Sequence, residues 1–353
     1  MGPLPAPEPS FRELRRVVLG EALPRRVHLA ELLFDDESLA SLAQRCGVDW
    51  VPYAPELAER HWRATVSLWH RLGYDYVRVS RSISFPGLVR KPSSGVSSGS
   101  RDWVEEGQGI IGNWKDFDAY PWPQNADFSR YEYVSRILPD GMAMMVSPCA
   151  GVFETVAEKL LGFEGMSYLL ADDPDLVAAV FQKVGELFES FYRQVVQLDN
   201  VGGFFQGDDF GYRSSLLASP SFLRRFVLPW HRKYAEIAHR RGKMYWLHSC
   251  GNVAAVMEDL LSDVRIDAFH SFQDEVLPVT DFCRRYGSRV AALGGVDMDN
   301  LCRLSEEDLR GYVRGILSSC MPGRFALGTG NSVARYVPVD NFLAMLEEAR
   351  RWG

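Results

Sequence analysis

A histidine and a cysteine two residues apart form the segment of this sequence most suited to chemistry. In His248-Ser249-Cys250-Gly251-Asn252 an apolar run ends and a helical segment follows, so imidazole and thiol project from one tight turn. Zinc prefers such a combination of a borderline nitrogen ligand and a soft sulfur ligand. The pair predicts a zinc site with an open position. The alternative is a hydrogen-bonded histidine beside an unrelated buried cysteine.

Two adjacent carboxylates are the second group of candidate functional residues. Asp208 and Asp209 lie in Gln206-Gly207-Asp208-Asp209-Phe210-Gly211, directly after another apolar run. Repulsion between neighbouring carboxylates can raise one pKa, so either residue could orient a ligand or exchange a proton. One of them could instead cap the turn that follows.

The elements that must position these residues alternate between strands and helices. Eight short apolar runs span 27–32, 76–80, 142–146, 203–206, 244–248, 268–270, 290–293 and 325–327. Helical periodicity covers about 55–72, 151–162, 173–197, 220–241, 252–263, 277–286, 305–319 and 338–352. Repeated βα units are typical of a parallel sheet. Eight of them predict an α/β protein, a (β/α)8 TIM barrel with an N-terminal helical extension, as a single domain over 1–353.

In such a barrel the carboxyl ends of all strands meet at one mouth, whatever their separation along the chain. We therefore expect the side chains that follow the strands to form the site. The expected substrate-binding residues are Arg81, Gln206, His270, Gln273, Asp297, Thr329 and Asn331, and the expected catalytic residues are Asp208, Asp209 and Glu31. Cys149 also follows a strand and is available as a further metal ligand.

Residues 81–140 interrupt the alternation after the second strand, with Ser, Gly, Pro and Trp accumulating in them. Insertions of this length in a compact domain are usually functional lids, although a surface elaboration without a role is the alternative. We expect this insertion on the catalytic face, where it would shape the pocket.

Composition excludes several classes of function. The net charge is −7, and neither sign gathers into a long block, so we expect no nucleic-acid or membrane partner. No apolar run approaches the ~18 residues of a membrane span, and the first residues lack the pattern of a secretion signal. The six cysteines are too sparse for a disulfide framework. These features predict a cytoplasmic location with free thiols.

Five segments, in order, resemble the uroporphyrinogen decarboxylase superfamily, which includes decarboxylases and zinc methyltransferases acting on methylated corrinoids. They are Trp114 to Pro123, Gly207 to Gly211, His248 to Asn252, Leu293 to Asp297, and Gly328 to Asn331 with Pro338 and Asn341 behind it. The likeness extends from about residue 25 to the end of the chain. It implies the same barrel fold.

The decarboxylase branch carries an arginine-rich signature near the first strand and a histidine after the last strand. Here residues 27–32 contain no arginine, and Thr329 stands at the histidine position, which argues against tetrapyrrole decarboxylation. His248 and Cys250 instead match two of the three zinc ligands of the methyltransferases. The third of those ligands is a cysteine where this chain has Asn331.

Asparagine is a poor zinc ligand, so the resemblance leaves two alternatives. Cys149, Glu31, Asp208 or Asp209 completes the site, or the turn binds no zinc and serves as a substrate contact or a thiolate nucleophile.

The resemblance favours a methyltransferase for a small-molecule substrate, with zinc activating an acceptor thiol and a corrinoid protein as partner. A homodimer is a further expectation. The alternatives are a decarboxylase of uroporphyrinogen or another carboxylated substrate, and a non-catalytic barrel that binds a corrinoid or tetrapyrrole.

Overall fold

A curled sheet of eight parallel strands forms the centre of the protein. The computed structural model describes residues 8–80, 82–86, 89–90, 103–104, 109–124 and 126–352. The strands are β1 (His28–Leu29), β2 (Tyr76–Val79), β5 (Ala143–Val146), β6 (Val201–Gly207), β7 (Met244–His248), β8 (Ala268–His270), β9 (Ala291–Val296) and β10 (Phe325–Thr329). Each of the eight apolar runs therefore overlaps one strand, and the TIM-type α/β fold is confirmed.

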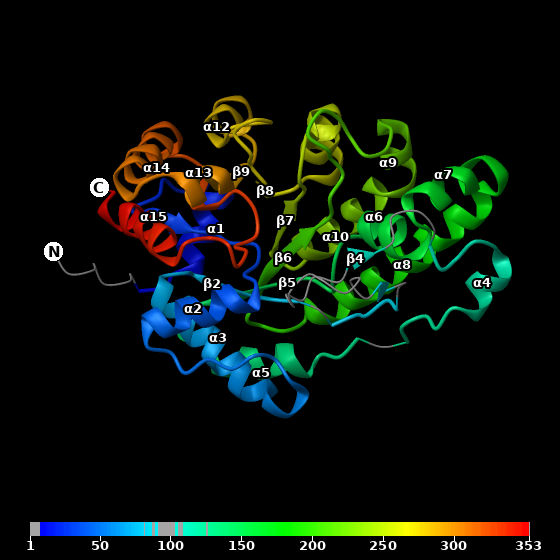
Figure 1. Cartoon of the computed structure of the whole chain (residues 1–353), viewed down its shortest axis with the longest axis horizontal. Helices are drawn as coiled ribbons and strands as arrows, with labels where there is room; N and C mark the ends of the chain where they lie inside the picture. Colours follow the sequence, from blue (N-terminus) through cyan, green and yellow to red (C-terminus); the bar gives the residue numbers. More distant parts are fainter. Residues whose placement is uncertain are drawn as a thin grey trace.

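The strand order is β1-β10-β9-β8-β7-β6-β5-β2, so β1 and β2 form the two edges of the sheet. Figure 1 shows the strands in the middle of the molecule with helices around them. Side chains join the two edges: the Tyr76 hydroxyl accepts the Glu31 N–H (2.8 Å) and donates to the Glu31 carbonyl oxygen (2.7 Å), and His28 Nδ1 of β1 lies 2.6 Å from Oδ2 of Asp75, directly before β2. The half-barrel is thus linked across its open side without a backbone ladder between β1 and β2.

Helices surround this sheet, and most of them pack on its outside. They are α1 (Phe11–Val18), α2 (Asp36–Cys46), α3 (Ala58–Leu72), α4 (Trp114–Ala119), α5 (Ser129–Ile137), α6 (Val152–Glu154), α7 (Phe163–Asp172), α8 (Pro174–Val195), α9 (Pro220–Phe226), α10 (Leu228–His239), α11 (Met257–Asp259), α12 (Val279–Tyr286), α13 (Met298–Arg303), α14 (Glu306–Cys320) and α15 (Val339–Arg351). Short 3-10 turns lie at Pro55–Leu57 and Ala254–Val256, and π-helical turns at Thr155–Leu160 and Leu260–Val264.

Several helix starts follow directly from the sequence. The Ser305 side chain accepts the Asp308 N–H at 3.2 Å, and acidic residues fill the first turn of α14, as its sequence predicts. Such a cap satisfies an orphan N–H, and the acids complement the helix dipole. The helix α1, which precedes β1, is the expected N-terminal extension.

The insertion is more regular than its composition predicts. Its described part contains α4, α5 and a short antiparallel hairpin of β3 (Val89–Arg90) and β4 (Trp103–Val104). The helix α5 packs against α3 and buries Tyr131 and Val134. It therefore belongs to the helical layer of the barrel, and only the stretch before it is an insertion proper. The helical pattern of α5 is hard to recognise in the sequence, because the helix is short and contains two tyrosines.

The interior of the barrel is aromatic below the mouth. The ring of Trp246 lies 5.4 Å from that of Tyr76 and 5.4 Å from that of Phe205, both edge to face. These three residues are fully buried and close the floor beneath the strand ends. Edge-to-face pairs of this kind add stability beyond the area they bury. The site above therefore rests on a rigid layer.

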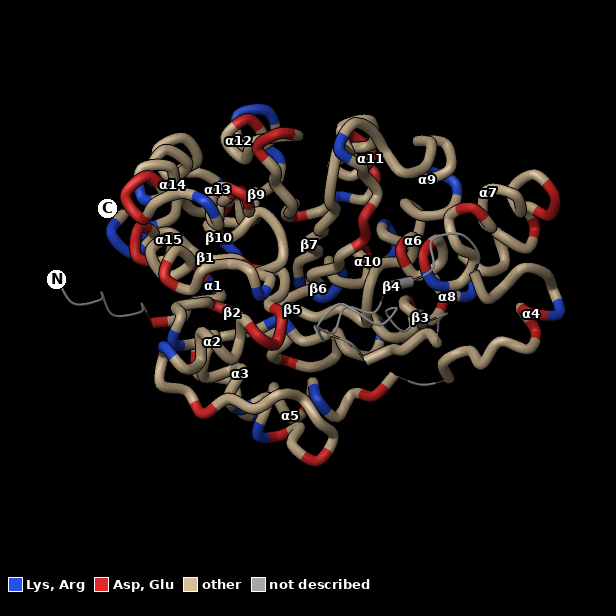
Figure 2. The backbone as a smooth tube through the Cα atoms, in the orientation of Figure 1, with Lys and Arg blue, Asp and Glu red and all other residues tan. Residues whose placement is uncertain are grey.

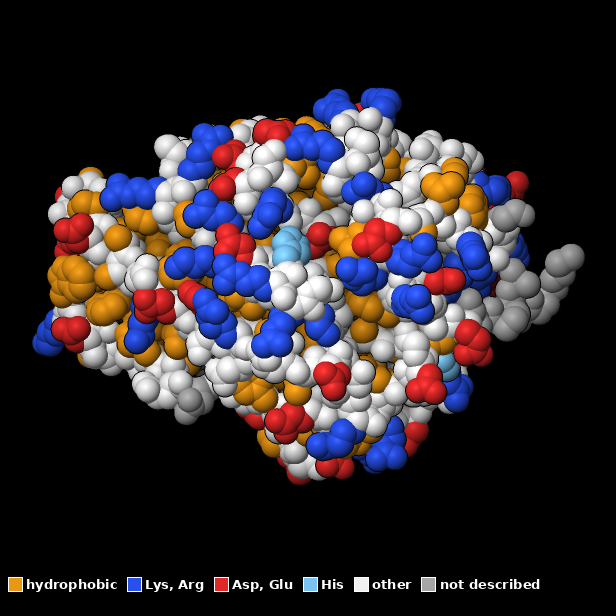
Figure 3. Space-filling model, turned by 180° about the vertical axis from the view of Figure 1, so that it is seen from behind, with side chains coloured by type: hydrophobic (Ala, Val, Ile, Leu, Met, Phe, Trp, Pro, Cys, Tyr) orange, Lys and Arg blue, Asp and Glu red, His pale blue; other side chains and the backbone are white. Residues whose placement is uncertain are grey.

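Charged residues lie mostly on the outer helices and loops (Figure 2). On the face seen in Figure 3, basic and acidic side chains both occur, with apolar side chains between them. Among the described residues, no helix combines the length and the apolar character that crossing a membrane requires.

Candidate functional site

The turns after β6 and β7 are packed against each other through glycines. Gly251 has a φ of +75°, and a Cβ atom there would lie 2.4 Å from the backbone carbon of Gly211. Only glycine allows both this backbone conformation and this approach. The close contact places Cys250 beside Asp209, and the Cys250 N–H donates to Asp209 Oδ1 at 2.8 Å.

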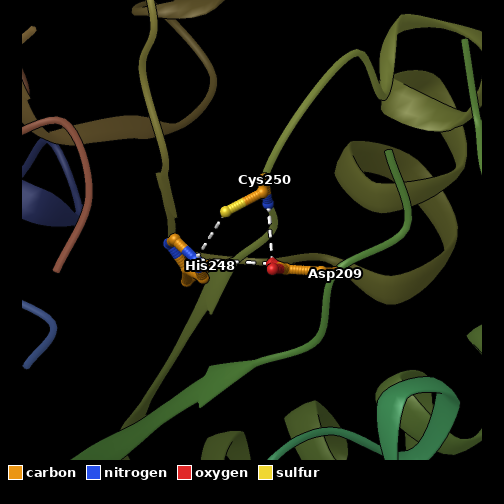
Figure 4. A group of neighbouring side chains, drawn as sticks. All are labelled: Asp209, His248 and Cys250. Atoms are coloured by element: carbon orange, nitrogen blue, oxygen red, sulfur yellow. Dashed lines mark hydrogen bonds and ion pairs between the residues drawn. The ribbon is translucent and has the colours of Figure 1, made fainter. Parts of the chain in front are cut away.

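Asp209, His248 and Cys250 form one compact group, called here the donor cluster (Figure 4). Their ligand atoms all lie within 4.8 Å of one another. His248 Nε2 is 3.4 Å from Asp209 Oδ1 and 3.4 Å from Cys250 Sγ. An imidazole nitrogen, a sulfur and a carboxylate oxygen that converge in this way are a suitable zinc ligand set. Of the third ligands that the sequence leaves open, the structure brings Asp209 into the cluster.

A second histidine lies behind the cluster and orients the His248 ring. His270 Nε2 is 3.0 Å from the carbonyl oxygen of Thr329, which only accepts, so this nitrogen carries a proton. Burial, and then the neighbouring charge of His248, hold the pKa of His270 well below its usual value. The neutral His270 therefore accepts through Nδ1 from His248 Nδ1 at 2.6 Å. His248 consequently directs Nε2 toward Cys250 and Asp209.

The electrostatics of the cluster favour a cation. Burial alone would lower the pKa of His248, but the sulfur of Cys250 and the carboxylate of Asp209 outweigh it and raise that pKa to about 10. Burial opposes ionisation of Asp209 too, yet its hydrogen bonds to His248 and to the Cys250 N–H hold its pKa below the usual range. A positive charge on His248 is thus stabilised beside the Asp209 carboxylate and the Cys250 sulfur.

Asn331 contacts the cluster as a hydrogen-bond donor. Its Nδ2 donates to Cys250 Sγ at 3.1 Å, while its Oδ1 accepts the Ser332 N–H at 2.7 Å. The amide nitrogen therefore faces the sulfur, and the amide oxygen turns away from it. A donor at this distance stabilises negative charge on sulfur, which is the form that binds a metal.

Glu31 and Thr329 lie beneath Asn331 and are fully buried. The Thr329 N–H donates to Glu31 Oε1 at 2.9 Å, and the Thr329 hydroxyl contacts both Glu31 Oε2 and the Asn331 carbonyl oxygen. Burial raises the pKa of Glu31 to about 8, so its carboxyl is protonated at neutral pH. A hydroxyl has a single proton, so a protonated Glu31 that donates to it satisfies both of its contacts. This pair supports the loop that carries Asn331.

Asp208 points away from the donor cluster. It is fully buried, lies 2.8 Å from His231 Nε2, and accepts the N–H groups of Phe153 (3.1 Å) and Glu154 (3.0 Å). These contacts occupy both carboxylate oxygens at the start of α6. Of the two adjacent carboxylates, Asp208 therefore stabilises the start of α6, and Asp209 belongs to the donor cluster.

A cavity of about 520 Å³, called here the site cavity, opens above the donor cluster. Cys149, Gln273 and Asn331 line it together with the cluster, as do two residues that sequence reasoning missed, Arg78 and Glu154. Burial raises the pKa of the Cys149 thiol to about 12, and Cys149 lies outside the donor cluster. Burial, followed by the charges of Asp209 and Asp208, holds the pKa of Glu154 well above its usual value.

The two missed residues differ in the signal that could have found them. Arg78 stands in the middle of the apolar run Tyr76-Val77-Arg78-Val79, where a charge is costly unless it has a role. Its guanidinium donates to Ser147 Oγ at 3.0 Å. Glu154 lies eight residues beyond the end of β5, and nothing in its sequence context indicates that α6 turns it back toward the mouth.

The remaining expected residues lie at the rim or below the site. Gln273 and Asp297 line a wider cavity of about 1040 Å³ beside Cys250. Asp297 accepts the N–H groups of Asp299, Asn300 and Asp274, so it caps α13. Gln206 is buried and donates to the Cys149 carbonyl oxygen at 3.2 Å. Arg81 lies outside the described residues.

Comparison with known proteins places the chain in a family. A family model for uroporphyrinogen decarboxylase (URO-D) matches residues 109–352. Among solved structures, a methyltransferase from Methanosarcina mazei superposes on 98% of this chain and 99% of its own, with a TM-score of 0.72 and 14% identity. At that identity the match shows a shared fold.

A second solved structure, a uronate isomerase from Bacillus halodurans, covers 97% of this chain and 85% of its own at 10% identity. Its TM-score of 0.36 is too low to carry an argument. No curated protein matches the sequence. The match of the family model over more than half of the residues is decisive: the chain belongs to the uroporphyrinogen decarboxylase family.

Proposed function

We propose that this protein is a methyltransferase whose donor cluster binds zinc and activates a small acceptor. The observation that carries the proposal is the convergence of Asp209 Oδ1, His248 Nε2 and Cys250 Sγ within 4.8 Å of one another. Three protein ligands and one open position are the usual arrangement of a catalytic zinc site. A bound zinc ion would lower the pKa of a coordinated acceptor thiol and so favour the thiolate.

The chain's own residues would prepare this chemistry. His270 fixes the ring of His248 so that Nε2 faces the cavity, and Asn331 stabilises negative charge on Cys250. Outer contacts of this kind orient the ligands and tune their basicity. Glu154, whose pKa is raised by burial and by the charges of Asp209 and Asp208, would serve as a proton donor or acceptor at the cavity wall.

The proposal also includes a source or acceptor of the methyl group outside this chain. The methyltransferase from Methanosarcina mazei shares the fold over nearly the whole chain, which supports methyl transfer as the reaction class. We propose that a corrinoid held by a partner protein delivers or accepts the methyl group at the open mouth. The wide cavity beside Cys250 offers access from that side.

Metal analysis of the purified protein tests the zinc site. We expect roughly one zinc ion per chain in the wild type and little in Cys250→Ala or Asp209→Asn. Cys149→Ala is the matched control, because it removes a thiol of the same cavity that lies outside the donor cluster, and it should keep the metal. A wild type that is metal-free and fully active would contradict the proposal.

Activity assays distinguish methyl transfer from decarboxylation. Methyl transfer from methylcobalamin to small thiols is expected in the zinc-loaded wild type and not in Cys250→Ala. Release of CO₂ from a carboxylated tetrapyrrole by the metal-free protein would instead assign a decarboxylase.

A further inference from the structure

A separate cavity lies on the other side of the barrel from the donor cluster. It has a volume of about 530 Å³ and is lined from α12, from the end of α14 and from the turn that leads into β10. The end of α14 and this turn come directly before β10, so the cavity lies toward the amino ends of the strands. The donor cluster, in contrast, lies at their carboxyl ends. We call this space the basal cavity.

Three sulfur-containing residues line the basal cavity: Cys283, Cys320 and Met321. Cys283 is half-buried on α12, and Cys320 is the buried last residue of α14. The two helices pack against each other (Figure 1). A hydrogen bond between the two thiols, followed by burial, raises the pKa of Cys283 above its usual range. The fold therefore brings two thiols from different helices within reach of each other at one cavity wall.

This set of donors differs in chemistry from the donor cluster. Thiolate and thioether sulfur are soft ligands, which select Cu(I), whereas the nitrogen, oxygen and single sulfur of the donor cluster suit zinc. The protonated state of the thiols does not prevent binding, because a metal ion deprotonates a thiol that coordinates it. One Cu(I) ion that binds both thiols forms two Cu–S bonds and releases two protons to solvent, and no electron is transferred.

The charged groups at the basal cavity favour a monovalent ion. Arg284 and Arg324 both line it. The Arg284 guanidinium lies 2.8 Å from Asp281 Oδ1, and Arg324 donates to the Arg289 carbonyl oxygen at 3.2 Å. Two thiolates on a monovalent ion leave a single negative charge, which nearby guanidinium groups stabilise. A divalent ion on the same two thiolates would leave no charge for them to offset.

We propose that the basal cavity binds a soft monovalent metal ion, Cu(I), with Cys283 and Cys320 as thiolate ligands and Met321 as a thioether ligand. The bound ion links α12 to the end of α14, and these helices lead into the neighbouring strands β9 and β10. Its role is therefore to stabilise this part of the barrel. None of the three ligands belongs to the donor cluster, so the site is independent of the proposed methyl transfer.

Anaerobic titration with Cu(I), in competition with a chromogenic Cu(I) chelator, tests the site. The parent protein for this titration is full-length Cys250→Ala, which lacks the thiol of the donor cluster. We expect roughly one Cu(I) ion per chain and roughly two protons released per ion, because both thiols must ionise. Failure to hold Cu(I) against the chelator, or binding without proton release, would overturn the proposal.

Substitutions in this parent locate the site. Cys283→Ser and Cys320→Ala should each weaken Cu(I) binding by at least about a hundredfold, because a single thiolate remains. Met321→Leu keeps the apolar shape and should weaken it by about tenfold. Cys302→Ser is the matched control, since Cys302 is also half-buried but lines the wide cavity beside Cys250, and it should keep the ion. Unchanged affinity in both Cys283→Ser and Cys320→Ala would refute the assignment.

Thermal unfolding shows whether the ion joins the two helices. Cu(I) should raise the midpoint of unfolding of the parent protein, because it binds where the fold brings the thiols together, and it should leave the midpoint of Cys283→Ser unchanged. An equal rise in both proteins would contradict a site made by Cys283. A disulfide between Cys283 and Cys320 in place of the ion, detected by mass spectrometry as the loss of both thiol hydrogens, would also overturn the metal site.

Discussion

The Nδ1 atoms of His248 and His270 lie 2.6 Å apart, and this contact decides which nitrogen of His248 faces Cys250. Replacing His270 with phenylalanine removes the acceptor and frees the His248 ring to rotate. Zinc affinity should fall by roughly 10–100-fold, the usual cost of losing such a contact. Competition with a chromogenic chelator measures it.

His270→Gln is the control for that prediction. Its amide oxygen can accept from His248 while its amide nitrogen donates to the Thr329 carbonyl oxygen, so it should recover part of the affinity. Equal affinity in His270→Phe and the wild type would show that the ring needs no such support.

The neighbours Asp208 and Asp209 should respond in opposite ways to the same substitution. Asp208→Asn removes a buried charge from His231 and from the start of α6, so the free energy of unfolding should fall by about 3 kcal/mol. Zinc content should stay near that of the wild type. Asp209→Asn should lose zinc and keep its stability. Urea denaturation with metal analysis measures both, and a stable, metal-free Asp208→Asn would reverse the two roles.

Relative to the wild type, Glu31→Gln should become more stable as the pH rises from about 4.5 to about 8. The pKa of Glu31 is about 8 in the folded state against 4.5 for an ordinary glutamate, so the native state binds more protons between these values. Wild-type stability therefore falls across that window, by up to about 1.4 kcal/mol per pH unit. Glutamine keeps the contacts to Thr329 without this penalty. Its advantage should be small near pH 4.5, grow toward pH 8 and then level off.

The activity of the same variant decides whether Glu31 is catalytic. Because Glu31 lies beneath Thr329 and does not line the site cavity, Glu31→Gln should keep most of the wild-type kcat. Loss of kcat without loss of stability would give Glu31 the catalytic role that its place after β1 predicts.

Asn331→Cys should strengthen the zinc site. The Asn331 amide nitrogen lies 3.1 Å from Cys250 Sγ, so a thiol at this position would lie next to the donor cluster and add a second sulfur ligand. We expect at least about tenfold tighter zinc binding under reducing conditions. Asn331→Ser, which adds no sulfur, is the control and should bind zinc no more tightly than the wild type.

The sequence predicted the scaffold well because its signals are local. Each of the eight short apolar runs overlaps a strand of the sheet, and Ser305 caps its helix as expected. The joint placement of His248 and Cys250 also follows locally, since two residues in one turn cannot separate. Asp209 could be foreseen only as one of several alternatives, because its approach to Cys250 depends on the packing of Gly211 against Gly251.

What could not be predicted depends on the direction of side chains in three dimensions. Nothing in the pair Asp208-Asp209 says which carboxylate turns toward α6 and which toward the mouth. Glu31 occupies a catalytic position in the strand order, yet the close approach of β1 and β10 directs it under Thr329. The short helix α6, which brings Glu154 into the site cavity, is likewise set by tertiary packing.

The Tyr76 bridge between β1 and β2 has a consequence for how the protein can diverge. Elsewhere around the sheet, any change in the spacing of neighbouring strands would break a series of backbone hydrogen bonds. At this seam side-chain contacts join the two edges, through the Tyr76 phenol and the buried His28–Asp75 pair, so substitutions on α2 and α3 can widen or narrow the adjoining cavity of about 200 Å³ without disturbing a ladder. Relatives could thus change the size of this cavity while the turn that carries His248 and Cys250, across the barrel, stays the same.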